Sequence, residues 1–180
     1  MLDQRLATRV ENFVSRLKRE SVCMHGFILD VRGEVKATAY YQPFEEGKAH
    51  RMYSVSKSMT ALAIGLLLDE GKISLDDRIA DYFRDYLPEK PDARLMRLKI
   101  RDMLRMATCY RATVYRETDD DGTKPFFTAA STHEPGTVFH YDTGCSQVLA
   151  ALVARLTGQQ VMDYLTARVF TPLGANDEKH

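Results

Sequence analysis

The sequence is poor in cysteine and carries no excess of charge of either sign. Its 180 residues include only three cysteines, Cys23, Cys109 and Cys145, and 25 basic side chains balance 25 acidic ones. Three thiols without a C-x-x-C pair exclude a disulfide framework and favour a reducing compartment. A formal net charge of +0 gives no electrostatic reason to expect nucleic acid or an anionic membrane as a partner.

Long hydrophobic runs are also absent. The longest apolar stretch, residues 61–68, is interrupted by Gly65 and followed by two acidic residues, so it is far too short to span a bilayer. The first residues show no apolar signal-peptide segment. A hydrophobic fraction of 44% with 28% charged residues is ordinary for a globular protein. We therefore expect a soluble, folded chain of one domain or two small ones.

Hydrophobic periodicity predicts a short β-hairpin followed by several helices. Apolar residues recur every three or four positions over 3–20, which predicts an amphipathic helix. Two apolar runs flank Arg32-Gly33 and predict the hairpin. The strands are expected over 26–31 and 34–41, the later helices over 55–70, 100–106, 146–156 and 162–169, and a long loop over 116–137. A lone hairpin is only marginally stable, and the sequence shows no obvious further strands to extend its sheet.

The strongest chemical signal is a serine and a lysine three residues apart at the start of the helix expected over 55–70. At that spacing Ser54 and Lys57 project from the same helix face. A serine hydroxyl is a poor nucleophile until a base takes its proton, and a lysine in an apolar site can be that base or tune another one. The helix N-terminus also directs the backbone N–H of Ser54 toward a developing oxyanion. The alternative is a helix cap followed by an exposed lysine, because S-x-x-K occurs by chance in many proteins.

The surrounding segment resembles the nucleophile segment of a known enzyme superfamily. Residues 53–77 read YSVSKSMTALAIGLLLDEGKISLDD. This stretch is similar to the serine β-lactamase and penicillin-binding-protein superfamily, above all to its class C β-lactamase branch, which also holds carboxylesterases, D-amino-acid peptidases and 6-aminohexanoate-dimer hydrolases. The resemblance implies that Ser54 is the acylated nucleophile and Lys57 its basic partner.

Three later stretches agree with the same superfamily in order and spacing: 98–104, 134–141 and 149–174. The resemblance places its Y-x-N motif at Tyr141, which it implies is the general base for acylation and the general acid for the leaving group. A phenol can do this at neutral pH if a cation such as Lys57 stabilises its phenolate. The alternative for Tyr141, taken without its flanking residues, is a half-buried structural tyrosine. Thr143 replaces the motif's asparagine, so we expect a substrate-binding residue suited to an esterase or amidase rather than a true β-lactamase.

The superfamily's third motif, K-T-G or H-x-G on a later strand, is not found. The chain therefore resembles the N-terminal half to two-thirds of such a protein. The implied fold class is α+β, β-lactamase/transpeptidase-like, without the C-terminal strands of its sheet. Residues 1–52 are expected to hold the N-terminal helix and hairpin, and residues 53–180 a mainly helical subdomain with both motifs. An open hairpin edge could pair with another chain, so a homo-oligomer is a further expectation.

Other chemistry-bearing residues give weaker signals. The five histidines show no metal-ligand spacing with one another or with the cysteines, so we expect no metal site, and the resemblance implies no cofactor. The acidic run 119–121 is interpreted as a solvated turn rather than a calcium loop. Four aromatic residues flank the long loop, where they either line a substrate pocket or cover the core: Tyr110, Tyr115, Phe126 and Phe127. Of these, Tyr110 is taken as a candidate substrate-binding residue beside Thr143.

Together these observations predict a cytoplasmic serine hydrolase that acts on ester, amide or lactam carbonyls through an acyl-enzyme on Ser54. Its partners would be small-molecule ester, amide or peptide substrates, with no nucleic acid and no membrane. The alternative is a non-catalytic or incomplete member of the fold that binds a peptide or acyl ligand, or that needs a partner chain.

Overall fold

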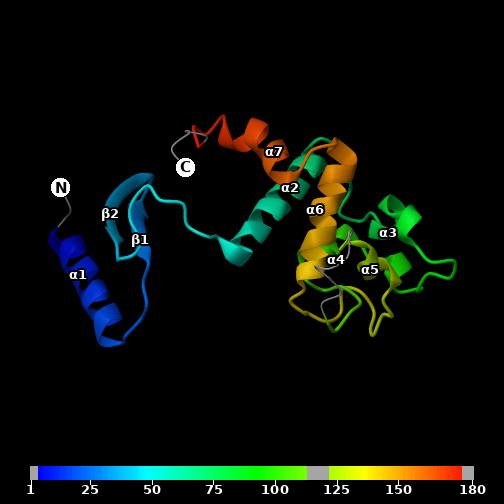
Figure 1. The fold of residues 1–180 in the computed structure, drawn as a ribbon, viewed down its shortest axis with the longest axis horizontal. Helices are drawn as coiled ribbons and strands as arrows, with labels where there is room; N and C mark the ends of the chain where they lie inside the picture. Colours follow the sequence, from blue (N-terminus) through cyan, green and yellow to red (C-terminus); the bar gives the residue numbers. More distant parts are fainter. Residues whose placement is uncertain (1–3, 113–121, 176–180) are drawn as a thin grey trace. The chain divides into compact units, whose positions relative to one another are not determined.

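A computed structural model describes residues 4–112 and 122–175, which form two compact units (Figure 1). One unit contains the described residues up to Arg51, and the other contains those from Met52 onward. Tyr115 and the predicted acidic turn at 119–121 lie outside the described residues, as does part of the loop expected over 116–137.

The first unit consists of one helix and a β-hairpin. Helix α1 covers Gln4–Arg19, and the antiparallel strands β1 and β2 cover Gly26–Val31 and Glu34–Tyr40. Arg32 and Gly33 between the strands both have positive φ angles, 58° and 78°. Two such residues form the turn whose twist matches that of the paired strands, so the predicted hairpin is confirmed.

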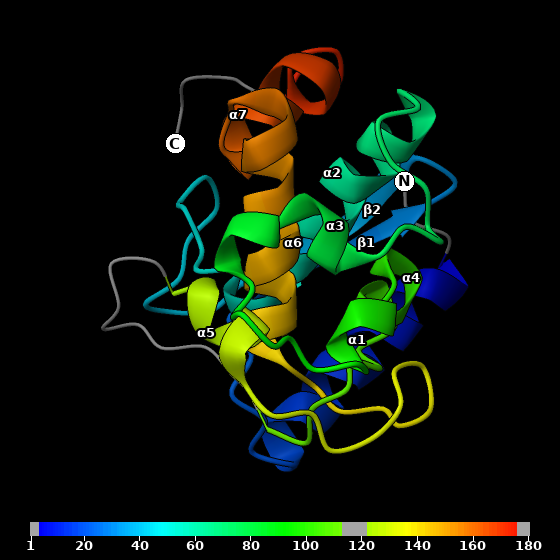
Figure 2. The same cartoon turned by 90° about the vertical axis from the view of Figure 1, so that its right-hand side faces the viewer.

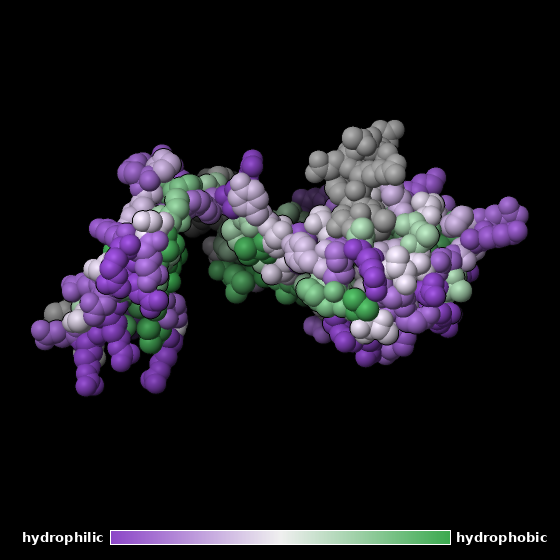
Figure 3. Space-filling view, turned by 90° about the horizontal axis from the view of Figure 1, so that it is seen from below, coloured by the Kyte–Doolittle hydropathy of each residue, from purple (hydrophilic) through white to green (hydrophobic). Residues whose placement is uncertain are grey.

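Helix α1 and the hairpin meet through aromatic side chains. The rings of Phe13 on α1 and Phe27 on β1 contact edge to face, with centroids 5.5 Å apart. Figure 3 shows hydrophilic side chains over α1 and hydrophobic ones on the hairpin side of this unit. Two of the hairpin's apolar residues, Ile28 and Val35, are 62% and 58% exposed. The hairpin therefore presents more apolar surface than α1 covers.

The second unit is built on two long helices that pack against each other, α2 over Lys57–Asp69 and α6 over Thr143–Thr157 (Figures 1 and 2). Helix α6 begins three residues before its expected start because Asp142 caps it, its Oδ1 accepting a hydrogen bond from the Gly144 N–H at 2.8 Å. Gly158, at φ 71°, ends it. The buried residues of the two helices supply the centre of the core: Ala63, Ile64, Leu67, Val148, Leu149, Leu152 and Val153.

Short helices and turns complete this unit. The helices are α3 (Ile79–Tyr82), α4 (Ile100–Leu104), α5 (Lys124–Thr128) and α7 (Val161–Leu165); the turns are three of 3-10 type (Tyr53–Ser56, Arg84–Tyr86, Leu95–Arg97) and one of π type (Thr166–Phe170). Helix α5 lies inside the segment expected to be a loop. Pro125 favours a helix start there, and Phe126 and Phe127 are 0% and 1% exposed, so burial of the two rings makes this segment part of the core.

Candidate active site

Ser54 lies in the 3-10 turn Tyr53–Ser56, directly before α2. The hydroxyl of Ser56 donates to the backbone carbonyl of Tyr53 at 2.6 Å and closes this turn. Tyr53 itself has a φ of 45°, a conformation that residues other than glycine rarely adopt. The backbone is therefore strained one residue before an exposed serine hydroxyl, a combination found at functional sites.

Lys57 is the first residue of α2, and its side chain returns to Ser54. Its Nζ donates a hydrogen bond to Ser54 Oγ at 3.0 Å. The same Nζ lies 5.2 Å from the centroid of the Tyr141 ring, within the range of a cation–π contact. One half-buried ammonium thus contacts both the serine and the tyrosine singled out in the sequence.

Tyr141 completes the cluster from the segment that leads into α6. Hydrogen bonding with the Ser54 side chain is the largest cause that lowers the pKa of the Tyr141 phenol below its ordinary value of 10.0, followed by hydrogen bonding with Lys57 and the charge of that lysine. Partial desolvation opposes the shift. These contacts therefore stabilise the phenolate form of Tyr141 relative to that of an isolated tyrosine.

Backbone hydrogen bonds hold the segment around Tyr141 in position. The N–H of His140 donates to the Met106 carbonyl at 2.8 Å, and the N–H of Gly136 donates to the Ala107 carbonyl at 2.7 Å. Asp142, on the other side of Tyr141, is fully buried as the cap of α6. The segment before Tyr141 is thus tied to the chain that follows α4, and the residue after it is anchored in the core.

The two remaining candidates occupy different environments. Thr143 is exposed at the first position of α6, two residues after Tyr141. Tyr110 is only 2% exposed, and its hydroxyl donates to the Phe126 carbonyl at 2.6 Å. The structure therefore places Tyr110 in the core, the second of the two environments that the sequence left open, because its ring and its hydroxyl are both satisfied inside the protein.

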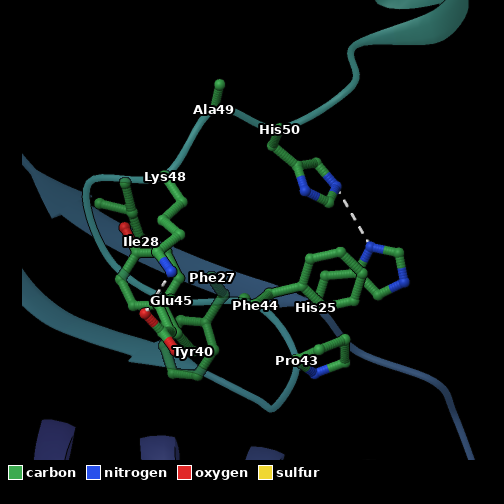
Figure 4. A pocket seen from close by; sticks show the side chains of 11 residues that line it. His25, Phe27, Ile28, Tyr40, Pro43, Phe44, Glu45, Lys48, Ala49 and His50 are labelled. Atoms are coloured by element: carbon green, nitrogen blue, oxygen red, sulfur yellow. Dashed lines mark hydrogen bonds and ion pairs between the residues drawn. The ribbon is translucent and has the colours of Figure 1, made fainter. Parts of the chain in front are cut away.

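A separate pocket of about 500 Å³ lies on the hairpin unit and was not expected from the sequence (Figure 4). His25 stacks on Phe44 with ring centroids 3.7 Å apart, and His25 Nδ1 lies 3.1 Å from His50 Nε2. Lys48 and Glu45, which also line the pocket, form an ion pair at 3.0 Å near Ile28 and Tyr40 (Figure 4). The two histidines are 25 positions apart, so no local spacing could have paired them.

Neither a cluster of metal ligands nor a helix able to span a membrane occurs among the described residues. Over 4–112 and 122–175, no three or more histidine, cysteine, aspartate or glutamate side chains gather as metal ligands. In the same stretches, no helix has the length and apolar character needed to cross a membrane.

Comparison with known proteins relates the whole arrangement to one family. Residues 25–178 match the family described as Beta-lactamase. The 6-aminohexanoate-dimer hydrolase of Paenarthrobacter ureafaciens is 27% identical over an alignment of 188 residues, gaps included, and this alignment covers 95% of this chain and 47% of the relative. Esterase EstB of Burkholderia gladioli is 27% identical over 176 residues, covering 87% of this chain and 45% of the esterase.

Solved structures share the fold. The D-amino acid amidase of Ochrobactrum anthropi superposes with a TM-score of 0.67 at 21% identity, covering 89% of this chain and 52% of the amidase. The chain thus spans about half the length of the relatives it matches. Because the family match covers residues 25–178, most of the chain, the protein belongs to the beta-lactamase family, and it has the β-lactamase/transpeptidase-like fold expected from its sequence.

Proposed function

We propose that this protein is a serine hydrolase that cleaves ester or amide carbonyls through an acyl-enzyme on Ser54. The observation that carries the proposal is the convergence of the Lys57 ammonium on the Ser54 hydroxyl and the Tyr141 ring. A hydrolytic activity is also supported by relatives named as a hydrolase and an esterase. The family alone would not identify the residues that react.

In the proposed acylation step, Ser54 Oγ attacks the carbonyl carbon while its proton passes to the Tyr141 phenolate. Lys57 stays an ammonium and stabilises that phenolate before the transfer. The backbone N–H of Ser54, at the start of its turn, is proposed to donate to the oxyanion. Collapse of the tetrahedral intermediate breaks the bond to the alcohol or amine, which leaves with the proton held by Tyr141.

Deacylation repeats this chemistry with water. Tyr141, again a phenolate, takes a proton from a water molecule that attacks the acyl carbon, and Ser54 leaves with that proton as the carboxylic acid is released.

We further propose that the exposed hydroxyl of Thr143 contacts the acyl side of the substrate. A threonine hydroxyl is shorter than an asparagine side chain and carries its donor and its acceptor on one atom, so it cannot occupy the two separate positions of an amide's NH2 and C=O groups. Simple esters and amides are therefore the expected substrates rather than β-lactams.

Covalent labelling tests the proposal directly. The chain is exposed to a fluorophosphonate and, separately, to p-nitrophenyl acetate, and the intact mass is measured. Ser56→Ala is the matched control, because Ser56 lies in the same turn but donates to the Tyr53 carbonyl.

One adduct in the wild type and in Ser56→Ala, absent in Ser54→Ala, is the expected result. An adduct that persists in Ser54→Ala would reject Ser54 as the nucleophile. A wild-type chain that is folded by circular dichroism yet forms no adduct would reject hydrolase activity for this chain.

A further inference from the structure

We propose that a cavity beside Lys57 binds the acyl chain of the substrate and selects uncharged aliphatic chains. This inference rests on the proposed function and specifies its substrate class. The cavity, called the acyl pocket below, has a volume of about 200 Å³ and opens between α2, α4 and α6. Its lining includes Lys57, and this residue places the pocket beside the nucleophile.

The position of the acyl pocket follows from helix geometry. Lys57 and Ala61 are four residues apart on α2 and both line the pocket, so it extends along one helix face for about one turn, ~5.4 Å. Ser54 precedes Lys57 by three residues and accepts its hydrogen bond at 3.0 Å, at the near end of that same face. A chain whose carbonyl carbon is bonded to Ser54 Oγ can therefore run past the lysine stem into the pocket.

The residues that line the acyl pocket determine which kind of acyl chain it can bind. One side of the pocket is apolar: Met103 and Leu149 are buried, and the half-buried Leu104 and Met106 join them from the α4 side. The α2 and α6 sides add three uncharged hydroxyl side chains, those of Ser58, Thr60 and Ser146. Methionine side chains are flexible and adapt to the shape of an apolar ligand. An engineered apolar cavity of about 150 Å³ holds benzene, so a pocket of this size suits a chain of roughly six carbons.

Charge adds a second element of selection. Lys57 is the only charged residue in the lining, and within the described residues no carboxylate lines the pocket. An acyl chain that ends in an ammonium group would bring a second cation into a pocket that already contains Lys57 and no counter-ion, and burying an unpaired charge is costly. An uncharged chain of the same length meets no such cost.

Two amides of equal length test the selection without any chemistry at Ser54. Hexanamide and 5-aminopentanamide have the same number of chain atoms and differ in the terminal methyl or ammonium group. Each is titrated into the ¹⁵N-labelled chain, and the backbone amide signals of Ala61, Met103 and Ser146 are followed by NMR. Hexanamide should shift them with a dissociation constant about tenfold below that of 5-aminopentanamide.

Matched variants locate the binding. Ala61 is exposed at the rim of the pocket, so Ala61→Phe can place its ring in the pocket without disturbing the core, and hexanamide affinity should fall at least about tenfold. Leu62→Phe introduces the same ring at the neighbouring position of α2, which is 40% exposed and does not line the pocket. It should bind hexanamide like the wild type.

Acylation by esters then separates this inference from the proposed function. p-Nitrophenyl hexanoate should acylate Ser54 faster than the acetate ester, and Ala61→Phe should abolish that advantage. Hexanamide that leaves the three signals unmoved, or binds Ala61→Phe as well as the wild type, would overturn the acyl pocket even if acetate acylates Ser54. Hexanamide binding without acylation by any ester would overturn the proposed function and leave the pocket as a binding site.

Discussion

Gly136 packs directly against the carboxylate of Asp102: a Cβ atom on residue 136 would lie 2.8 Å from Asp102 Oδ1. Gly136 also has a φ of 79°, which other residues adopt only with strain. Asp102 is nearly buried, and its other carboxylate oxygen accepts a hydrogen bond from the Lys99 N–H. The glycine therefore allows the segment that leads to Tyr141 to lie close to α4.

This contact predicts a large effect of Gly136→Ala. The new methyl group meets the carboxylate and the backbone is strained, so the free energy of unfolding should fall by more than about 1 kcal/mol. If the segment moves away from α4, Tyr141 moves with it, so the rate of Ser54 acylation should fall as well. Urea unfolding and labelling kinetics measure the two effects on the same protein.

Gly65→Ala is the matched control. Gly65 lies inside α2, where a Cβ atom would meet nothing within 4 Å. A helical glycine costs about 0.5–1 kcal/mol relative to alanine, so this variant should be more stable than the wild type. If Gly136→Ala proved as stable as Gly65→Ala, the close packing between Gly136 and Asp102 would be disproved.

The parts of this structure that the sequence predicted depend on short-range pattern. The hairpin turn at Arg32-Gly33 needs two neighbouring residues with positive φ, and the face shared by Ser54 and Lys57 needs only helical spacing. The approach of Tyr141 to Lys57 is different, because the two residues are far apart in sequence and only the resemblance to a family connected them.

Features created by tertiary packing could not be predicted in this way. Helix α5 forms inside an expected loop because the core takes in two phenylalanine rings, which no local periodicity announces. The contact between His25 and His50 arises because the chain returns to the hairpin after β2. The choice between core and substrate pocket for Tyr110 was likewise decided by a partner distant in sequence, the Phe126 carbonyl.

Tyr110→Phe tests that placement of Tyr110. The substitution leaves the Phe126 carbonyl without its 2.6 Å donor in the core, and an unsatisfied buried acceptor costs about 1–3 kcal/mol. The urea midpoint should fall accordingly, while the rate at which a fluorophosphonate labels Ser54 should match the wild type. A variant of unchanged stability with slower labelling would instead assign Tyr110 to the substrate site.

Glu70 gives the fold a predictable acid sensitivity. Its carboxylate binds Lys72 at 2.7 Å, Tyr164 at 2.9 Å and Arg168 at 3.0 Å, and thereby connects the end of α2 to α7. The Lys72 hydrogen bond is the main cause that lowers the pKa of Glu70 from 4.5 to about 2. A depressed pKa contributes stability that is present above the unfolded-state value and is lost as the pH falls toward the folded-state value.

Glu70→Gln should therefore lower the melting temperature at pH 7 and have progressively less effect as the pH falls from about 4.5 to about 2. Lys72→Met keeps the carboxylate but removes its main partner, so its deficit should shrink over the same window. A Glu70→Gln deficit of equal size at pH 7 and at pH 2.5 would show that this carboxylate does not titrate as described.

Tyr141 should titrate below the ordinary pKa of a phenol because Ser54 and Lys57 stabilise its phenolate. The difference in tyrosinate absorbance between the wild type and Tyr141→Phe isolates the Tyr141 phenol from the other eight tyrosines. Three of those eight are also separated by their own pKa, because burial raises the pKa of Tyr82 and Tyr164 to about 12 and raises that of Tyr110 further. Lys57→Met should move the Tyr141 midpoint upward, whereas Lys72→Met should not.

Since only the phenolate accepts the serine proton, acylation should accelerate as the pH rises through this same midpoint, and Tyr141→Phe should slow it by about 10²–10⁴. A midpoint at or above 10, or one that ignores the loss of Lys57, would remove the physical basis for Tyr141 as the general base.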